Sequence, residues 1–160
     1  MLRRMAVRFL VVGAILAFGV TPALAGPGVG LSLGEGMMIQ DDVELSPLNA
    51  EAMVYWSFAN VSADLGFLFT LEKFGVKEAE LVTIRPGVRV AIPGICYLRG
   101  ALPMNVLDDF NYGFLVGVGK TFLNLQALKL FAEVDATFME NAKFVDQFPI
   151  EARVGLEIGF

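Results

Sequence analysis

Apolar and polar residues alternate strictly over residues 148–160. The apolar positions are Phe148, Ile150, Ala152, Val154, Leu156, Ile158 and Phe160, and between them lie Pro149, Glu151, Arg153, Gly155, Glu157 and Gly159. Successive side chains of a β-strand point to opposite faces, so a period of two predicts a strand. One face of this strand is wholly apolar, and the other carries three charges and two glycines.

The same alternation recurs upstream. Together with residues 148–160, it predicts eight strands, near residues 29–36, 51–58, 62–72, 82–92, 96–105, 110–119, 128–138 and 148–160. The first of these carries the weakest pattern, because its alternation fails at Glu35. Pro86 and Pro103 lie within predicted strands, and a proline cannot donate a ladder hydrogen bond. We therefore expect bulges or strand ends at these two prolines.

Short and longer connections alternate between the predicted strands. Tight hairpin turns are expected at Ala59-Asn60, Pro93-Gly94 and Leu123-Asn124. The other connections are mostly longer, and they lie near residues 37–48, 73–79, 106–109 and 139–147. An even strand number with this alternation predicts an all-β fold, an eight-stranded antiparallel up-and-down transmembrane β-barrel, with both termini on one side.

A targeting segment is expected before the barrel. Arg3, Arg4 and Arg8 form a basic region, residues 9–20 form an apolar run, and Ala23-Leu24-Ala25 offers a small-residue cleavage site. The run is about half the ~20 residues that a transmembrane helix needs. We therefore predict a cleavable signal peptide over residues 1–25 and one barrel domain over residues 26–160.

Composition supports a barrel over two other folds. The chain is 56% hydrophobic, yet after residue 25 no segment has the ~18 consecutive apolar residues of a membrane helix. A soluble lipocalin-like barrel would carry the same alternation with its apolar face inside. Against this rival, the polar face is rich in glycine, which suits a cramped interior. Aromatic residues of the apolar face, such as Trp56 and Phe138, also lie toward strand ends, where membrane girdles belong.

Charged residues gather on the predicted inner face. They comprise the acids Glu51, Asp64, Glu133, Asp135, Glu151 and Glu157 and the bases Arg85, Arg89, Arg99, Lys129 and Arg153. An eight-stranded barrel encloses just enough room for its own side chains. We therefore predict a lumen plugged by ion pairs, because isolated charges there would cost several kcal/mol. The alternative is a charged path for solutes.

The sequence does not favour an enzyme. It contains no histidine, and Gly30-Leu31-Ser32-Leu33-Gly34, although it matches a nucleophile pattern, lies on a predicted strand without the required elbow or base. No zinc spacing, phosphate loop or dinucleotide fingerprint occurs. We expect no catalytic residue, no metal and no cofactor.

Charge and cysteine content narrow the expected partners. Without Arg3, Arg4 and Arg8 the chain keeps nine basic residues against 17 acidic ones, a net charge of −8, which argues against a nucleic-acid partner. Acidic residues dominate the predicted longer connections; they are Asp41, Asp42, Glu44, Glu78, Glu80, Asp108, Asp109, Glu140 and Asp146, against Lys77 and Lys143. They indicate solvated loops; the alternatives are bridging through divalent cations to lipopolysaccharide, or docking of a basic partner. The single cysteine, Cys96, cannot form an internal disulfide, and a monomer is expected.

Over residues 26–160 the pattern resembles the small eight-stranded outer-membrane barrels, such as OmpX and the membrane domain of OmpA. The resemblance implies an outer-membrane location, contact with outer-membrane lipid and lipopolysaccharide, and insertion by the barrel-assembly machinery. It also implies that Phe160, with Ile158 and Leu156 before it, serves as the assembly signal. The predicted function is a non-enzymatic barrel with a structural, envelope-stabilising or loop-mediated role. The alternative is a narrow channel or a binder of small solutes or lipids.

Overall fold

The computed structural model describes residues 26–39, 43–71, 82–105, 110–125, 127–140 and 148–160, so the predicted signal peptide lies outside the described residues. The strands are β1 (Gly26–Ile39), β2 (Val43–Phe58), β3 (Val61–Thr70), β4 (Val82–Ile92), β5 (Cys96–Ala101), β6 (Met104–Asn105), β7 (Asn111–Leu125), β8 (Leu128–Glu140) and β9 (Phe148–Gly159). Within these ranges, no helix is long and apolar enough to cross a membrane.

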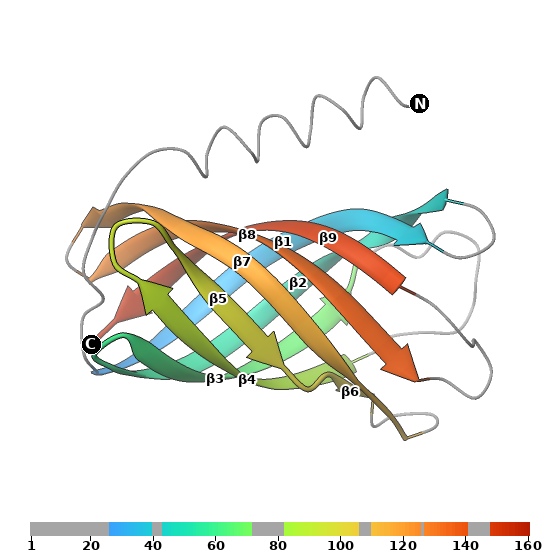
Figure 1. The fold of residues 1–160 in the computed structure, drawn as a ribbon, viewed down its shortest axis with the longest axis horizontal. Coiled ribbons are helices and arrows are strands. Elements are labelled where there is room, and N and C mark those ends of the chain that lie inside the picture. Colours follow the sequence, from blue (N-terminus) through green and yellow to red (C-terminus); the bar gives the residue numbers. More distant parts are fainter. Residues whose placement is uncertain (1–25, 40–42, 72–81, 106–109, 126, 141–147) are drawn as a thin grey trace.

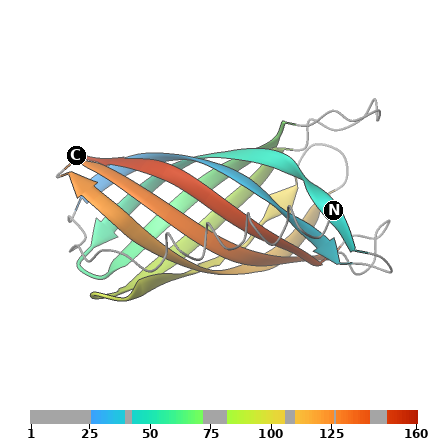
Figure 2. The ribbon, with the colours of Figure 1, turned by 90° about the horizontal axis from the view of Figure 1, so that it is seen from above.

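The strands form a closed antiparallel barrel (Figures 1 and 2). Sequential neighbours pair with each other, and β1 pairs with β9 to close the sheet. The short strands β5 and β6 both pair with β4 on one side and β7 on the other, so they are two pieces of a single strand. The barrel therefore has eight strands, as the alternation predicts.

The two ends of the barrel differ in their connections (Figure 1). At the end near Phe160, here called the short-turn end, lie Ala59-Asn60, residues 93–95 and the turn after Leu125. The backbone N–H of Phe160 donates to the carbonyl oxygen of Pro27 at 2.9 Å, so β1 starts beside the end of β9. The ends of β1, β3 and β8 and the starts of β2, β4 and β9 lie at the opposite end of the barrel.

One predicted turn was wrong. Instead of turning at Leu123-Asn124, β7 continues to Leu125, and Asn124 pairs with Lys129 of β8. The β7–β8 ladder shifts by one residue between Thr121 and Leu123, which leaves Phe122 as an extra residue. A bulge of this kind reverses the faces of all residues after it, so the alternation stopped being readable before the strand ended.

The predicted 37–48 connection was also wrong in extent, because β1 runs to Ile39 and β2 begins at Val43. The β1–β2 ladder shifts between Gly34 and Gly36, where two residues of β2, Pro47 and Leu48, lie opposite Glu35. The β1–β9 ladder is regular through Glu35, which pairs with Ala152. Glu35 thus interrupts the hydrophobic pattern without interrupting the strand.

Both prolines border one local break in the sheet. Pro103 separates β5 from β6, as predicted, whereas β4 runs through Pro86 with its β3 register intact. The carbonyl oxygen of Pro86 accepts a hydrogen bond from the N–H of Leu102 at 2.9 Å. The backbone N–H and C=O of a strand residue point to the same side, so the missing donor of Pro86 faces the β5–β6 break.

The outer face of the barrel is apolar and the lumen is polar. Leu31 and Phe58 are each 65% exposed on the outer face, whereas Glu133 and Arg153 are almost completely buried. A soluble barrel would show the inverse arrangement. The structure therefore excludes the lipocalin-like rival and confirms the predicted inside and outside faces.

Aromatic side chains gather at both ends of the outer face. Trp56 and Phe58 lie 6.0 Å apart at the short-turn end, and Phe114 and Phe138 stack at 5.4 Å toward the other. On β9, twelve residue steps separate Phe148 from Phe160. At about 3.3 Å per residue and a tilt of about 40°, they span roughly 30 Å along the barrel axis. This height matches the ~25 Å apolar band of membrane barrels flanked by its girdles.

Candidate functional site

Arg99 of β5 lies at the centre of the lumen. Its guanidinium contacts three carboxylates from three other strands: Glu51 of β2 at 2.8 Å, Asp64 of β3 at 2.9 Å and Glu133 of β8 at 3.2 Å. The side chains of Arg99 and of these three acids are almost completely buried. Hydrogen bonds with charged partners are the strong ones, so Arg99 ties strands together across the barrel interior.

Arg153 of β9 forms a second centre. Its guanidinium contacts Glu151 at 2.8 Å, and Asp135 and Glu51 at 3.3 Å each. Arg85 of β4 approaches Glu51 at 3.7 Å and Glu151 at 3.6 Å. Glu51 therefore has three arginine partners, from β4, β5 and β9.

Arg89 of β4 lies nearer the short-turn end. It hydrogen-bonds Glu157, and its Nε lies 3.3 Å from Asp64. The guanidinium carbon is 5.2 Å from the ring centroid of Tyr97 and 5.5 Å from that of Phe131, distances at which a cation is attracted to an aromatic face. Arg89 is thus held by both carboxylates and rings.

The strand register places like charges side by side. Arg89 lies directly opposite Arg99 on the β4–β5 ladder, and Asp135 lies opposite Glu151 on the β8–β9 ladder. Like charges in such positions repel. Each pair is bridged by a residue of opposite charge: Asp64 contacts both arginines, and Arg153 contacts both acids.

The structure places all eleven predicted lumen charges on the inner face. Ten of them form one continuous network of ion pairs: Glu51, Asp64, Arg85, Arg89, Arg99, Glu133, Asp135, Glu151, Arg153 and Glu157. The eleventh, Lys129, places its ammonium 5.9 Å from the ring centroid of Tyr55. The residues of the predicted assembly signal, Leu156, Ile158 and Phe160, are exposed on the outer face.

The lumen also contains aromatic side chains, which the sequence analysis did not include among the expected lumen residues. Tyr55, Tyr97 and Phe131 are buried in the lumen beside the arginines and Lys129. Their place among the polar positions of the alternation is the sequence signal that could have identified them as lumen residues. Glycine makes room for them: at Gly119 a Cβ would overlap the ring of Tyr97, and at Gly155 it would come within 2.6 Å of the Phe131 ring.

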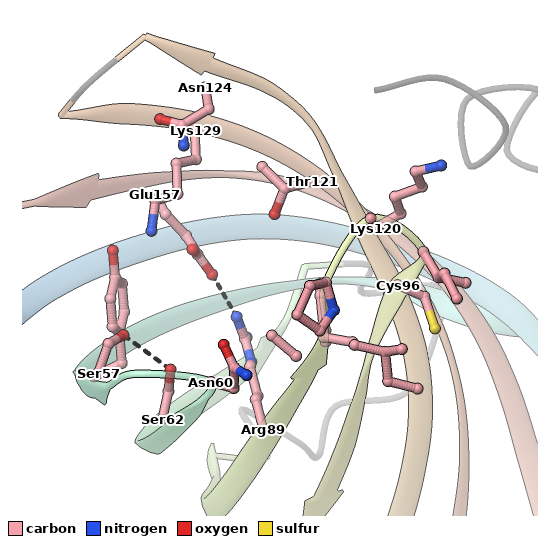
Figure 3. A pocket seen from close by; sticks show the side chains of 17 residues that line it. Ser57, Asn60, Ser62, Arg89, Cys96, Lys120, Thr121, Asn124, Lys129 and Glu157 are labelled. Atoms are coloured by element: carbon pink, nitrogen blue, oxygen red, sulfur yellow. Dashed lines mark hydrogen bonds and ion pairs between the residues drawn. The ribbon is translucent and has the colours of Figure 1, made fainter. Parts of the chain in front are cut away.

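A pocket of about 160 Å³ lies at the short-turn end of the lumen (Figure 3). The polar lining is Tyr55, Ser57, Asn60, Ser62, Arg89, Tyr97, Lys120, Thr121, Asn124, Lys129 and Glu157. The Ser57 and Ser62 hydroxyls hydrogen-bond each other at 2.8 Å. Among the described residues, no group of three or more cysteine, histidine or acidic side chains could hold a metal ion.

Comparison with known proteins identifies the fold. No family model and no curated protein matches the chain. Neisserial surface protein A has a similar solved structure, with a TM-score of 0.64, 12% identity, and coverage of 85% of this chain and 98% of that one. Designed transmembrane β-barrels are also similar, one with a TM-score of 0.58 at 12% identity, covering 88% of this chain and 100% of that one. The chain therefore has the fold of small transmembrane β-barrels, both natural and designed.

Proposed function

We propose that this chain is a non-enzymatic integral protein of the outer membrane, similar in role to the OmpX and OmpA membrane barrels. It stabilises the envelope or presents its connections to a partner. The observation that carries the proposal is the combination of an apolar outer face, flanked by aromatic residues, with a lumen closed by a ten-residue ionic network. Such a barrel has a surface suited to lipid and no open path through its centre.

The location is tested by fractionation of a Gram-negative host that expresses the full chain. We expect recovery with the outer membrane and heat-modifiable migration on gels, because a closed barrel resists detergent until it is heated. Recovery in the soluble periplasmic fraction would contradict the proposal.

Because the lumen is closed, we expect no ion conductance across planar bilayers. The refolded barrel should give no steady conductance, because Arg99 and Arg153 fill the cross-section with charge-assisted contacts to four strands in all. Single-channel recording is the measurement, with a known porin as the positive control. Steady, ion-selective openings that change in Arg89→Gln or Glu133→Gln would replace this proposal with the channel alternative.

A role for the connections is separable from a role for the barrel. Replacing residues 72–81 or 141–147 with short glycine-serine linkers keeps every described strand intact. If the connections bind a partner, these variants lose adhesion while the host keeps its detergent resistance. If the barrel itself stabilises the envelope, only deletion of the whole chain lowers that resistance.

Assembly is proposed to depend on the outer face of β9, where Phe160 is 77% exposed. Phe160→Ser should sharply reduce membrane insertion by the barrel-assembly machinery while export continues. The amount of folded barrel in the membrane is measured against Phe58→Ser, which removes another strongly exposed aromatic residue (65%) at the same end of the barrel. An equal loss in both variants would show a general girdle effect and no assembly signal at Phe160.

A further inference from the structure

One section of the barrel wall lacks two hydrogen bonds of the β-ladder. The strand register places Pro86 of β4 opposite Leu102, and Pro103 opposite Gly113 of β7. Each pair forms one bond at 2.9 Å, from the N–H of Leu102 to the Pro86 carbonyl oxygen and from the N–H of Gly113 to the Pro103 carbonyl oxygen. The return bond of each pair would need a proline N–H, which does not exist. The carbonyl oxygens of Leu102 and Gly113 therefore lack their ladder donors.

The weakness is confined to the short piece of wall between β4 and β7 that contains β6 (Figure 1). On one side of it, the β3–β4 ladder is continuous from Val82 to Val90. On the other side, the β7–β8 ladder is continuous from Tyr112 to Thr121. A barrel wall in lipid has to satisfy its backbone groups within the sheet, so two missing bonds in one section make that section the easiest to open.

Residues 102–105 also differ from the lower part of their strand in how the lumen holds them. Arg99 anchors β5 through ion pairs with three carboxylates. Gly100 follows, and a Cβ there would meet no atom within 4 Å, so this backbone position can move without repacking a side chain. Beyond it, Leu102 and Pro103 offer no polar side chain to the ionic network. The strand is thus fixed below Gly100 and weakly held above it.

A single side-chain bond joins the far end of this section to β4. The Thr83 hydroxyl donates to the Asn105 side-chain oxygen at 2.6 Å. Next to it on β7, the rings of Phe110 and Tyr112 lie 6.3 Å apart on the outer face. Such aromatic residues mark the membrane surface, so backbone groups released at this end can reach water.

We propose that residues 102–105 form a flap in the barrel wall, which opens about Gly100 while the other ladders stay closed. The hydrogen bond between Thr83 and Asn105 is the latch of this flap. The flap opens outward, because Leu102 is 59% exposed on the outer face whereas Pro103 is fully buried against the filled lumen.

The open flap gives the lumen a lateral entrance beside Arg85. Arg85 precedes Pro86 on β4, and its Nε and Nη1 have no hydrogen-bond partner among the described residues. Arg99 still closes the lumen toward the short-turn end, so the entrance is not a pore. The inference goes beyond the proposed envelope role, which the barrel can fill with the flap closed.

Amide hydrogen exchange tests the flap, measured by NMR on the labelled barrel in nanodiscs. The N–H groups of Leu102 and Gly113 should share one protection factor, because residues that open together exchange together. We expect it to be at least about tenfold lower than that of the Ile150 N–H, which lies opposite Met37 in the unbroken β1–β9 ladder at the same end of the barrel. Equal protection at all three positions would overturn the proposal.

Three substitutions assign the opening to the prolines and the latch. Pro86→Val supplies the missing N–H on the outer face and should raise both flap protection factors roughly two- to tenfold, as for one backbone hydrogen bond. Thr83→Val removes the latch and should lower them by a similar factor. Pro149→Val is the matched control, because it adds an N–H opposite Met38 of β1, outside the flap. No change in Pro86→Val, or an equal rise in Pro149→Val, would contradict the assignment.

A reversible lock provides a second measurement. Thr83→Cys and Asn105→Cys, combined with Cys96→Ser, place two cysteines opposite each other on the β4–β6 ladder, at a spacing that a disulfide can bridge. The oxidised barrel should protect the N–H groups of Leu102 and Gly113 as well as that of Ile150, and a reductant should restore their faster exchange. Heat-modifiable migration verifies that each variant has folded. Identical exchange in the oxidised and reduced forms would show that no flap opens.

Discussion

Arg99→Met should lower the free energy of unfolding by about 3–5 kcal/mol, the cost typical of removing one partner from a buried ionic group. The variant leaves Glu51, Asp64 and Glu133 without their central cation and leaves Asp64 with Arg89 alone. Equilibrium urea unfolding in lipid vesicles, followed by tryptophan fluorescence of Trp56, measures the loss.

A double-mutant cycle separates this effect from lost packing. Glu133 forms an ion pair with Arg99 at 3.2 Å. The double variant Arg99→Met, Glu133→Gln should therefore recover part of the lost stability, because the buried carboxylate without a partner has been removed. Lys120 pairs with Ala132 on the β7–β8 ladder and forms no ion pair within the described residues, so Lys120→Met should cost less than about 1 kcal/mol, as for charges outside buried pairs. If Arg99→Met costs no more than Lys120→Met, the ionic network does not hold the lumen together.

The faces of the strands could be predicted from the sequence because the side-chain period of a strand is two. After residue 147 the charged residues Glu151, Arg153 and Glu157 are buried inside, and Phe148, Val154, Leu156, Ile158 and Phe160 are exposed outside, as the alternation predicts. The ends of strands were less predictable. A bulge at Phe122 reverses the pattern within β7, and a polar Glu35 occupies an outer-face position within a regular β1–β9 ladder. From the period alone, neither event can be told apart from the end of a strand.

The composition of the lumen network could also be predicted, but its contacts could not. Which charges meet depends on the stagger between strands, which is a property of the closed barrel and not of any one strand. Arg89 and Arg99 were both expected inside, yet nothing in the sequence indicates that they lie opposite each other with Asp64 between them. For the same reason the sequence did not predict that Lys129 would approach Tyr55 and stay outside the network.

Leu156→Arg should destabilise the barrel by about 2–4 kcal/mol, the cost measured for arginine near the midplane of the bilayer on the lipid face of membrane barrels. Leu156 is 46% exposed, and it lies between Leu31 of β1 and Leu130 of β8 on an entirely apolar stretch of the outer face. It lies two residues from Val154, the midpoint between Phe148 and Phe160. An arginine there must reach the interface past apolar neighbours or lie in hydrocarbon.

The cost of an outward-facing arginine depends on its depth in the bilayer, so a comparison of two depths tests for a membrane specifically. Phe58→Arg places the same charge at the short-turn end, on a side chain that is 65% exposed, and should cost only about 0–1 kcal/mol because the guanidinium reaches water. Gly155→Ala, next to Leu156 but on the inner face, should act through the Leu31 carbonyl oxygen and the Phe131 ring instead of through lipid. Urea unfolding of the three variants in vesicles is the measurement. If both arginine variants cost the same, the outer face does not lie in a bilayer with the barrel ends at its surfaces, and the membrane assignment fails with it.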